Sequence, residues 1–327
     1  MRILVALYSE IQSWCIPEPQ LEELRRAFPE HTFVRADSDE ATLAAIPDAD
    51  VAFSSSLTRA HLAAATSLRW VHSSAAGVGG MLFPEMVRSS VVVTNSRGNS
   101  STTIAEHVIA VTLALMRDFP LAWRRQTEKV WAQDEFGAGA SIRTLRGADV
   151  LVVGVGSIGA ETARLAAAFG ARVVGIRRRA DLPRPAGVQA VLGPERLLEA
   201  LPAADVVVLS APQTASTLHL IGERELALMK DDAILVNVSR GKLIDEPALV
   251  RALEGGRLRG AALDVFEHEP LDGNSPLWDR RDVLITPHIS GFHAGHWPRV
   301  TQLFADNLRR FAAGQPLENV VDKEAGY

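Results

Sequence analysis

Three polar residues with complementary chemistry follow apolar segments in the second half of the chain. Arg240 comes shortly after residues 233–238, Glu269 after residues 260–264, and His288 after residues 283–286. Short apolar runs that alternate with helical patterns predict the strands of a parallel sheet. Ligands of such sheets bind at the carboxyl ends of the strands. We therefore expect Arg240, Glu269 and His288 to converge on one ligand.

These three side chains could reduce a 2-keto acid. The planar guanidinium of Arg240 can bind a carboxylate and reach the neighbouring carbonyl oxygen. His288 can supply a proton, since imidazole has an unperturbed pKa of about 6.5. Glu269 can hold the other ring nitrogen and favour the protonated ring. We expect the neighbouring Glu267 and His268 to be exposed loop positions. His107, which lies in a helical pattern, is expected to be structural.

A glycine-rich segment upstream predicts the second reactant. Residues 154–159 read Gly-Val-Gly-Ser-Ile-Gly, between an apolar run at 150–153 and a helical pattern at 160–169. In that context Gly154 allows a tight turn, Gly156 lets a pyrophosphate approach the backbone, and Gly159 lets the helix pack on the strand. The phosphates would meet free N–H groups at the start of the helix. We predict a dinucleotide site, with the alternative of a glycine-rich turn that binds nothing.

The end of the next predicted strand, 172–176, bears on the choice of dinucleotide. An NAD site usually has an acidic residue there, bonded to the ribose 2′-hydroxyl. This chain has Arg177, Arg178 and Arg179, with no acid until Asp181. Guanidinium groups suit a 2′-phosphate, so we predict that NADP(H) is preferred and that NAD(H) is possible. The alternative is a solvated basic loop in an arginine-rich chain.

Composition narrows the class of protein. The chain has 327 residues, of which 47% are hydrophobic and 22% charged, with a net charge of −5. This length favours two domains, and the acidic balance argues against a nucleic-acid partner. No apolar run is long enough to cross a membrane, and the single cysteine, Cys15, excludes an internal disulfide and a multi-cysteine zinc site. We expect a cytoplasmic protein without a metal.

The elements form two α/β series. The first is predicted from strands at 3–7, 32–35, 51–53, 70–72 and 91–94, with helices at 19–28 and 41–46. A long buried helix at 103–117 follows, opened by polar residues at 99–102 suited to capping, and residues 119–146 are less regular. The second series has six strands, at 150–153, 172–176, 206–210, 233–238, 260–264 and 283–286. A last helix is expected at about 297–313. Both series predict doubly wound parallel sheets.

The motifs together resemble the D-isomer-specific 2-hydroxyacid dehydrogenase family over most of the chain. Residues 74–79 are similar to the family's substrate-carboxylate loop, residues 94–115 to its hinge and dimer helix, and residues 210–212 with 217–221 to its cofactor-side loop. The resemblance implies two Rossmann-like domains, a discontinuous substrate domain at 1–96 and 291–327 and a dinucleotide-binding domain at 97–290. It also implies a homodimer.

The resemblance assigns roles residue by residue. The catalytic residues would be Arg240, Glu269 and His288, and the substrate would be bound by Ala76, Gly77, Val78, Arg240 and His288. The cofactor contacts would be Gly154, Gly156, Ser157, Ile158, Gly159, Arg177, Arg178, Arg179, Ala211, Pro212, Thr217, Val238, Arg240, Asp264 and His288. Asp264 would face the nicotinamide.

The hypothesis is a reductase of small 2-keto acids, such as glyoxylate or hydroxypyruvate. Phe292 and Trp297 depart from the family pattern and could narrow the pocket or pack between the domains. Formate dehydrogenase activity is disfavoured, because those members have Gln at the position of Glu269. Two alternatives stay open: the same chemistry with NAD(H) on a bulkier 2-keto acid, and a dinucleotide-sensing scaffold that is not an enzyme.

Overall fold

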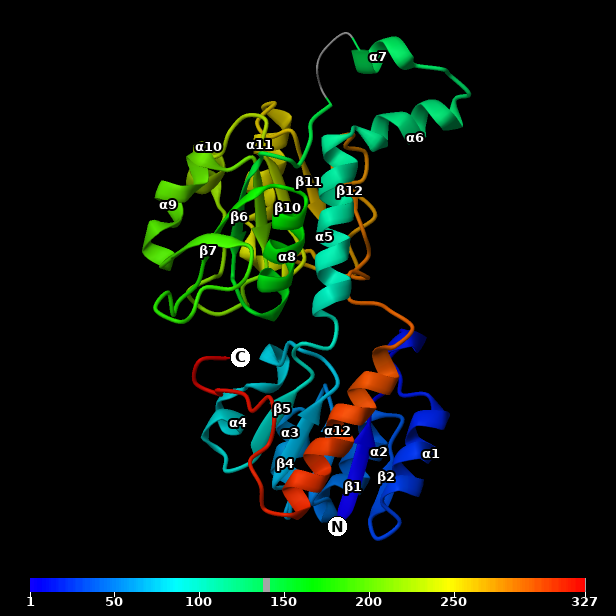
Figure 1. Cartoon of the computed structure of the whole chain (residues 1–327). Helices are drawn as coiled ribbons and strands as arrows, with labels where there is room; N and C mark the ends of the chain where they lie inside the picture. Colours follow the sequence, from blue (N-terminus) through cyan, green and yellow to red (C-terminus); the bar gives the residue numbers. More distant parts are fainter. Residues whose placement is uncertain (138–141, 327) are drawn as a thin grey trace. The chain divides into compact units, whose positions relative to one another are not determined.

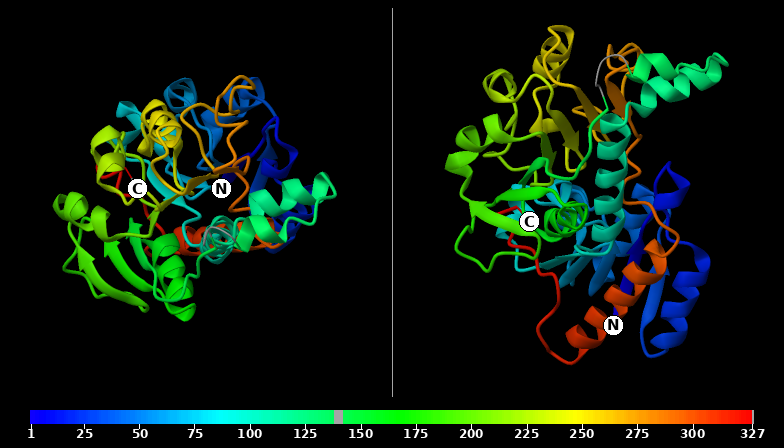
Figure 2. Two further views of the ribbon diagram at one scale, coloured as in Figure 1. Left: turned by 90° about the horizontal axis from the view of Figure 1, so that it is seen from above. Right: turned by 45° about the horizontal axis from the view of Figure 1, so that its top comes forward.

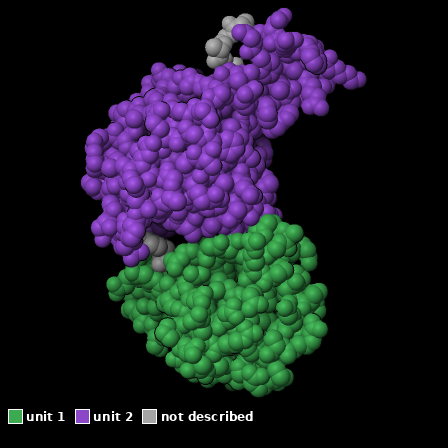
Figure 3. All heavy atoms as spheres, viewed as in Figure 1, with its two compact units in different colours: residues 1–99, 293–327 green, residues 100–292 purple. Residues whose placement is uncertain are grey.

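The computed structural model describes residues 1–137 and 142–326, which form two compact units (Figures 1 and 3). Unit 1 contains residues 1–99 and 293–327, and unit 2 contains residues 100–292. The predicted boundaries at 96/97 and 290/291 lie close to this division. The assignment of one unit to the substrate and the other to the cofactor stays a prediction.

Unit 1 is built on a five-stranded parallel sheet in the order β2-β1-β3-β4-β5. This is one of the two common doubly wound orders. Phe53, Trp70 and Phe304 stack in the core on one face of the sheet, and Leu4 and Val71 belong to the core on the other face. The strands are β1 Arg2–Ala6, β2 Thr32–Arg35, β3 Val51–Ser54, β4 Trp70–Ser73 and β5 Val92–Asn95. The helices are α1 Glu18–Ala27, α2 Asp39–Ala45, α3 Arg59–Ala64, α4 Pro84–Arg88 and α12 His296–Ala312, with short 3-10 turns at Gln12–Trp14, Ile46–Asp48 and Gly79–Met81.

Unit 2 is built on a seven-stranded parallel sheet in the order β12-β11-β10-β9-β6-β7-β8. The strand order reverses between β6 and β9, which is where doubly wound sheets bind ligands. The strands are β6 Asp149–Val153, β7 Arg172–Ile176, β8 Val188–Leu192, β9 Val206–Leu209, β10 Ile234–Asn237, β11 Gly260–Leu263 and β12 Val283–Ile285. The helices are α5 Ser101–Met116, α6 Phe119–Thr127, α7 Gln133–Gly137, α8 Ser157–Ala168, α9 Leu197–Ala200, α10 Glu223–Leu228 and α11 Glu246–Glu254, with 3-10 turns at Pro194–Arg196, Leu201–Ala203 and Gly241–Leu243. The α/β fold class is therefore confirmed.

Both faces of the unit 2 sheet are covered. Val150 and Val152 of β6 pack with α5 and α8 on one face, and Leu151 and Val153 pack with α9, α10 and α11 on the other. Alternate residues of a strand point to opposite faces of the sheet. Because both faces of β6 are buried, residues 150–153 are apolar at every position. Helix α5 lies along α8 (Figures 1 and 2).

The structure corrects three expectations about the elements. The second sheet has seven strands, not six, because β8 pairs with β7 at the sheet edge and is mostly half-buried, which weakens its apolar pattern. Ser100 precedes α5 as its N-cap, but its side chain makes no capping hydrogen bond. Residues 119–137, expected to be irregular, contain α6 and α7, which project from the body of unit 2 (Figure 1).

Candidate active site

The glycine-rich turn joins β6 to α8 and has the geometry of a phosphate cradle. Gly154 has a φ of +100°, and a Cβ there would lie 2.3 Å from the backbone nitrogen of Ala211. A Cβ on Gly159 would lie 2.2 Å from the carbonyl oxygen of Gly154, whereas a Cβ on Gly156 would meet nothing within 4 Å. The backbone is thus closely packed on the protein side and open at Gly156. The first N–H groups of an α-helix have no partner within the helix, so those at the start of α8 can bind phosphate. The turn fits a dinucleotide.

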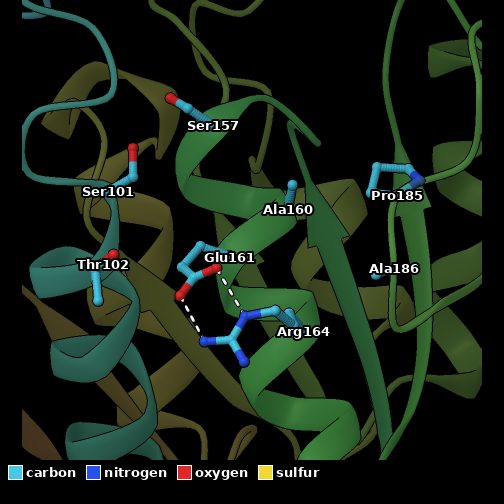
Figure 4. Close-up of a pocket in the computed structure, with 8 residues that line it drawn as sticks. All are labelled: Ser101, Thr102, Ser157, Ala160, Glu161, Arg164, Pro185 and Ala186. Atoms are coloured by element: carbon cyan, nitrogen blue, oxygen red, sulfur yellow. Dashed lines mark hydrogen bonds and ion pairs between the residues drawn. The ribbon is translucent and has the colours of Figure 1, made fainter.

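A groove adjoins this turn on the outer side of α8. It has a volume of about 260 Å³ and lies between the first turn of α5, the outer face of α8 and the loop before β8 (Figure 4). Ser157 lies at the start of α8 at one end of the groove, and Glu161 and Arg164 form a two-point ion pair in it, with N–O distances of 2.9 and 2.7 Å. The predicted contact residue Ile158 occupies the next position of α8 and packs against the core.

The three arginines after β7 differ in their environments. The Arg177 guanidinium donates to the carbonyls of Leu182 and Pro183 and so holds its own loop together. Arg178 and Arg179 are exposed. Arg177 therefore has a structural role that the sequence did not reveal, and a role for the triplet toward a 2′-phosphate stays a prediction.

The loops after β9 and β10 border the same end of the sheet. Thr217 donates to the carbonyl of Pro212 at 2.7 Å and thereby closes the loop that follows β9. Ser239 donates to the carbonyl of Ala211 and ties this loop to the one after β10. Val238 is buried next to Ser239. Because the backbone of Ala211 packs against Gly154, the predicted contact residues of both loops lie near the glycine-rich turn.

Glu269 and His288 are in direct contact, with 2.6 Å between Glu269 Oε2 and His288 Nδ1. The other carboxylate oxygen of Glu269 accepts the N–H of Phe266 at 3.0 Å. Burial by itself would raise the pKa of Glu269, but the hydrogen bonds from His288 and Phe266 and the charge of Arg240 outweigh it, so this pKa is lowered. An ionised Glu269 fixes the orientation of the His288 ring through Nδ1.

Arg240 lies close enough to Glu269 for each charge to affect the pKa of the other. Burial lowers the pKa of the Arg240 guanidinium, and the Glu269 carboxylate opposes that shift. Its Nη1 donates to the carbonyl of Ser239 at 2.6 Å. The structure thus brings Arg240, Glu269 and His288 to one end of one sheet. Two residues close to Glu269, Glu267 and His268, were expected to be exposed. His268 is exposed. Glu267 is half-buried, and its Oε1 lies 3.0 Å from Nε2 of His219.

Asp264 has a role that sequence reasoning missed. It is 1% exposed, and its Oδ1 accepts from the hydroxyl of Thr286 at 2.6 Å and from the N–H of Ile289 at 2.9 Å. Its Oδ2 accepts from the N–H of Ser290 at 3.0 Å. The carboxylate therefore pins both sides of His288, whose φ is +53°. Contact of Asp264 with a nicotinamide stays a prediction.

Two further side chains belong to this support. Thr286 Oγ1 also lies 3.3 Å from His107 Nε2 of α5, which gives His107 the structural place expected of it. Burial lowers the pKa of His107, so its ring is neutral at neutral pH. In the sequence, the only sign of the contacts among Asp264, Thr286 and His107 is that Thr286 lies two residues before His288.

Of the two aromatic residues that depart from the family pattern, Trp297 packs into the core of unit 1.

The predicted substrate loop lies in unit 1, after β4. Ala76 and Gly77 are exposed and Val78 is buried. The Ala75 N–H donates to Ser73 Oγ at 3.1 Å, and the Ala76 carbonyl accepts from Asn95 Nδ2 at 2.7 Å. Among residues 1–137 and 142–326, no hydrogen bond is donated by the N–H groups of Ala76, Gly77 or Val78.

Comparison with known proteins defines the class. Residues 109–290 match the model for the D-isomer specific 2-hydroxyacid dehydrogenase, NAD binding domain. The chain is 36% identical over 263 residues to the glyoxylate reductase of Korarchaeum cryptofilum, covering 80% of this chain and 78% of that protein. It is 33% identical over 289 residues to the D-3-phosphoglycerate dehydrogenase of Methanocaldococcus jannaschii, but spans only 53% of that protein's length. The solved structure of a D-isomer specific 2-hydroxyacid dehydrogenase from Xanthobacter autotrophicus, in complex with NADPH and MES, is similar with a TM-score of 0.85 at 30% identity, covering 99% of each chain.

The chain therefore belongs to the D-isomer specific 2-hydroxyacid dehydrogenase family. It is a hydroxyacid oxidoreductase with an NAD-binding domain. No helix of the described residues is long and apolar enough to cross a membrane. In the same part of the chain, no group of three or more His, Cys, Asp or Glu side chains could hold a metal ion.

Proposed function

We propose that this protein is a cytoplasmic NADP(H)-dependent reductase of small 2-keto acids such as glyoxylate or hydroxypyruvate. The observation that carries the proposal is the 2.6 Å contact between Glu269 and His288 beside the charge of Arg240. A carboxylate, an imidazole and a guanidinium at the carboxyl end of one sheet are the groups that this reduction needs. The glyoxylate reductase among the relatives supports the choice of substrate.

The proposed mechanism assigns one task to each side chain. The Arg240 guanidinium binds the substrate carboxylate and polarises the keto carbonyl. His288 donates a proton from Nε2 to the carbonyl oxygen as the hydroxyl forms, and in the reverse direction it accepts that proton. Glu269 keeps the ring in place through Nδ1. A bound nicotinamide cofactor supplies the hydride. The backbone amides of Ala76, Gly77 and Val78 contribute further hydrogen bonds to the carboxylate.

The preference for NADP(H) rests on the basic loop after β7. The NADPH in the Xanthobacter structure is consistent with this preference. Because the Arg177 guanidinium is bonded to carbonyls of its own loop and Arg179 is exposed, we assign the 2′-phosphate to Arg179. The test compares NADPH and NADH in Arg179→Ala, with Arg184→Ala as the control in the same loop. We expect the preference for NADPH to fall about tenfold, which corresponds to one charge-assisted hydrogen bond, only in Arg179→Ala.

The experiment on the reaction follows absorbance of the reduced nicotinamide. NADPH and NADH are each tested against glyoxylate, hydroxypyruvate, pyruvate and phenylpyruvate. Rapid oxidation of NADPH with glyoxylate or hydroxypyruvate supports the proposal. Activity only with NADH, or only with phenylpyruvate, contradicts the cofactor or the substrate assignment. Tight NADPH binding without turnover of any substrate would favour the sensing scaffold.

We also propose that the protein is a homodimer that uses the α6 and α7 region. Trp131 is 90% exposed, and Phe119, Trp123 and Val130 of the same segment are also exposed. Exposed apolar patches of this kind mark interaction sites. We expect light scattering to give twice the chain mass for the wild type and the single mass for Trp131→Asp. The control Trp278→Asp, at another exposed tryptophan of unit 2, should stay dimeric, and a monomeric wild type would contradict the assignment.

A further inference from the structure

The loop after β4 is held from one side, by the end of β5. The N–H of Ser96 donates to the carbonyl of Ala75 at 3.1 Å. The side-chain amide of Asn95 donates to the carbonyl of Ala76 at 2.7 Å. The carbonyl of Ala75 therefore points toward Ser96, which follows β5, and the carbonyl of Ala76 points toward Asn95, the last residue of β5.

The planarity of the peptide bond decides where the loop amides point. In a trans peptide, the carbonyl and the next N–H lie in one plane and point in opposite directions. Fixing the Ala75 and Ala76 carbonyls toward β5 turns the N–H groups of Ala76 and Gly77 away from β5. Ala76 and Gly77 are exposed, so both N–H groups are open to a ligand. Successive N–H groups that face one side form a concave site for an anion.

Asn95 is itself fixed in the orientation that this requires. It is 2% exposed, and its Oδ1 accepts the N–H of Arg97 at 3.3 Å. Because a backbone N–H can only donate, the oxygen of the side chain must face Arg97 and the NH2 group must face Ala76. The backbone N–H of Asn95 donates to the carbonyl of Asn319 at 3.2 Å. The C-terminal segment thus holds Asn95 in place as well.

We propose that Asn95 is a positioning residue that orients the peptide between Ala76 and Gly77, so that the Gly77 N–H binds the substrate carboxylate. This inference rests on the proposed function, in which the loop binds that carboxylate. Asn95 does not touch the substrate. Its side-chain amide acts only through the carbonyl of Ala76.

The first test is the kinetics of Asn95→Ala with glyoxylate and NADPH. Loss of the bond to Ala76 frees the peptide to rotate, which weakens carboxylate binding equally in the ground state and the transition state. We expect KM for glyoxylate to rise about 10- to 100-fold, the range of a hydrogen bond to a charged group, while kcat and the Kd of NADPH change little. Thr42→Ala is the control, because Thr42 is also a buried polar residue of unit 1 whose side chain donates to a backbone carbonyl, that of Ser38 at 2.8 Å. An unchanged KM in a folded Asn95→Ala, or an equal rise in Thr42→Ala, would overturn the inference.

A second variant separates orientation from loss of packing. Asn95→Asp keeps the shape and the acceptor for Arg97, but it places a carboxylate against the Ala76 carbonyl. Protonation of that aspartate restores a donor, so we expect the ratio of its KM to the wild-type KM to fall as the pH is lowered from 7.5 to 5. A ratio that does not change with pH would contradict the proposed hydrogen bond.

A binding measurement keeps this inference distinct from the proposed function. Protein labelled with nitrogen-15 glycine is titrated with oxalate, which carries carboxylates and is not reduced by a hydride donor in this assay. The Gly77 amide should shift in the wild type and in Thr42→Ala, and should not shift in Asn95→Ala. Absence of turnover in the wild type would refute the proposed function, whereas a Gly77 shift that survives in Asn95→Ala, or no shift in the wild type, would refute the role of Asn95.

Discussion

Acidification is expected to destabilise unit 1, because His72 is buried as a neutral imidazole. The ring is fully buried on β4, and burial lowers its pKa to about 3. Its Nδ1 lies 2.7 Å from Thr94 Oγ1, which also accepts the indole N–H of Trp70 at 2.8 Å. The Ser96 hydroxyl donates to the carbonyl of Ser73 at 2.9 Å, so Ser96 Oγ accepts from Nε2–H of His72 at 3.3 Å. Nδ1 then carries no proton and accepts from the Thr94 hydroxyl. A proton on Nδ1 would disrupt this chain of hydrogen bonds.

The size of the effect follows from the two pKa values of His72. The folded state resists protonation down to about pH 3, whereas the unfolded chain takes up the proton near pH 6.5. The unfolded state binds more protons in this window, so stability is intact above pH 6.5 and falls as the pH is lowered. At about 1.4 kcal/mol per pH unit, the loss at pH 5 is about 2 kcal/mol.

Urea unfolding at several pH values between 7.5 and 5 tests this prediction. His72→Gln retains a donor and an acceptor but cannot titrate. We expect it to be less stable than the wild type at pH 7.5, and to lose about 2 kcal/mol less than the wild type between pH 7.5 and 5. His268→Gln, at an exposed position, should follow the wild-type curve. Parallel curves for the wild type and His72→Gln would refute the reasoning.

Three other predictions concern unit 2. His288→Gln should lower kcat about 10²- to 10⁴-fold, the usual contribution of a general acid, and steady-state kinetics with normal NADPH binding would check it. Gly159→Ala places a Cβ 2.2 Å from the carbonyl of Gly154 and should raise the Kd for NADPH by at least tenfold, as measured by fluorescence titration; unchanged affinity would mean that the turn does not bind the cofactor. Asp264→Asn turns an NH2 group toward a backbone N–H and should cost about 1–3 kcal/mol of stability and lower kcat, with denaturant unfolding and kinetics as the two measurements. Loss of stability without loss of kcat would show that the loop tolerates the change.

The glycine-rich turn and the contact between Glu269 and His288 could be predicted from the sequence for one physical reason. In a parallel sheet, residues at the ends of neighbouring strands meet at the same edge, so their positions along the chain are enough to place them together. The requirement for glycine at 154 and 159 is also local, since it depends on a tight turn between a strand and a helix.

The unpredicted features depend on which segments become neighbours in space. A basic residue such as Arg177 has the same sequence context whether it faces a phosphate or the carbonyls of its own loop, as it does here. The edge strand β8 is mostly half-buried, so its residues lack the continuous apolar run of the central strands. The bond from Asn95 to Ala76 joins residues 19 positions apart, and no spacing rule predicts it.

The two carboxylates near His288 have different physical roles, and this difference explains the unusual backbone there. A positive φ is uncommon for a residue with a Cβ and costs about 1–2 kcal/mol, yet His288 has a φ of +53°. The buried Asp264 compensates, because it accepts the N–H groups of the two residues that follow His288, while the His288 N–H donates to the Asp264 carbonyl at 2.9 Å. Glu269 acts on the ring and not on the backbone, through Nδ1. The imidazole of His288 is therefore constrained at its backbone by Asp264 and at its ring by Glu269, so two carboxylates from the same segment after β11 fix the position of one side chain.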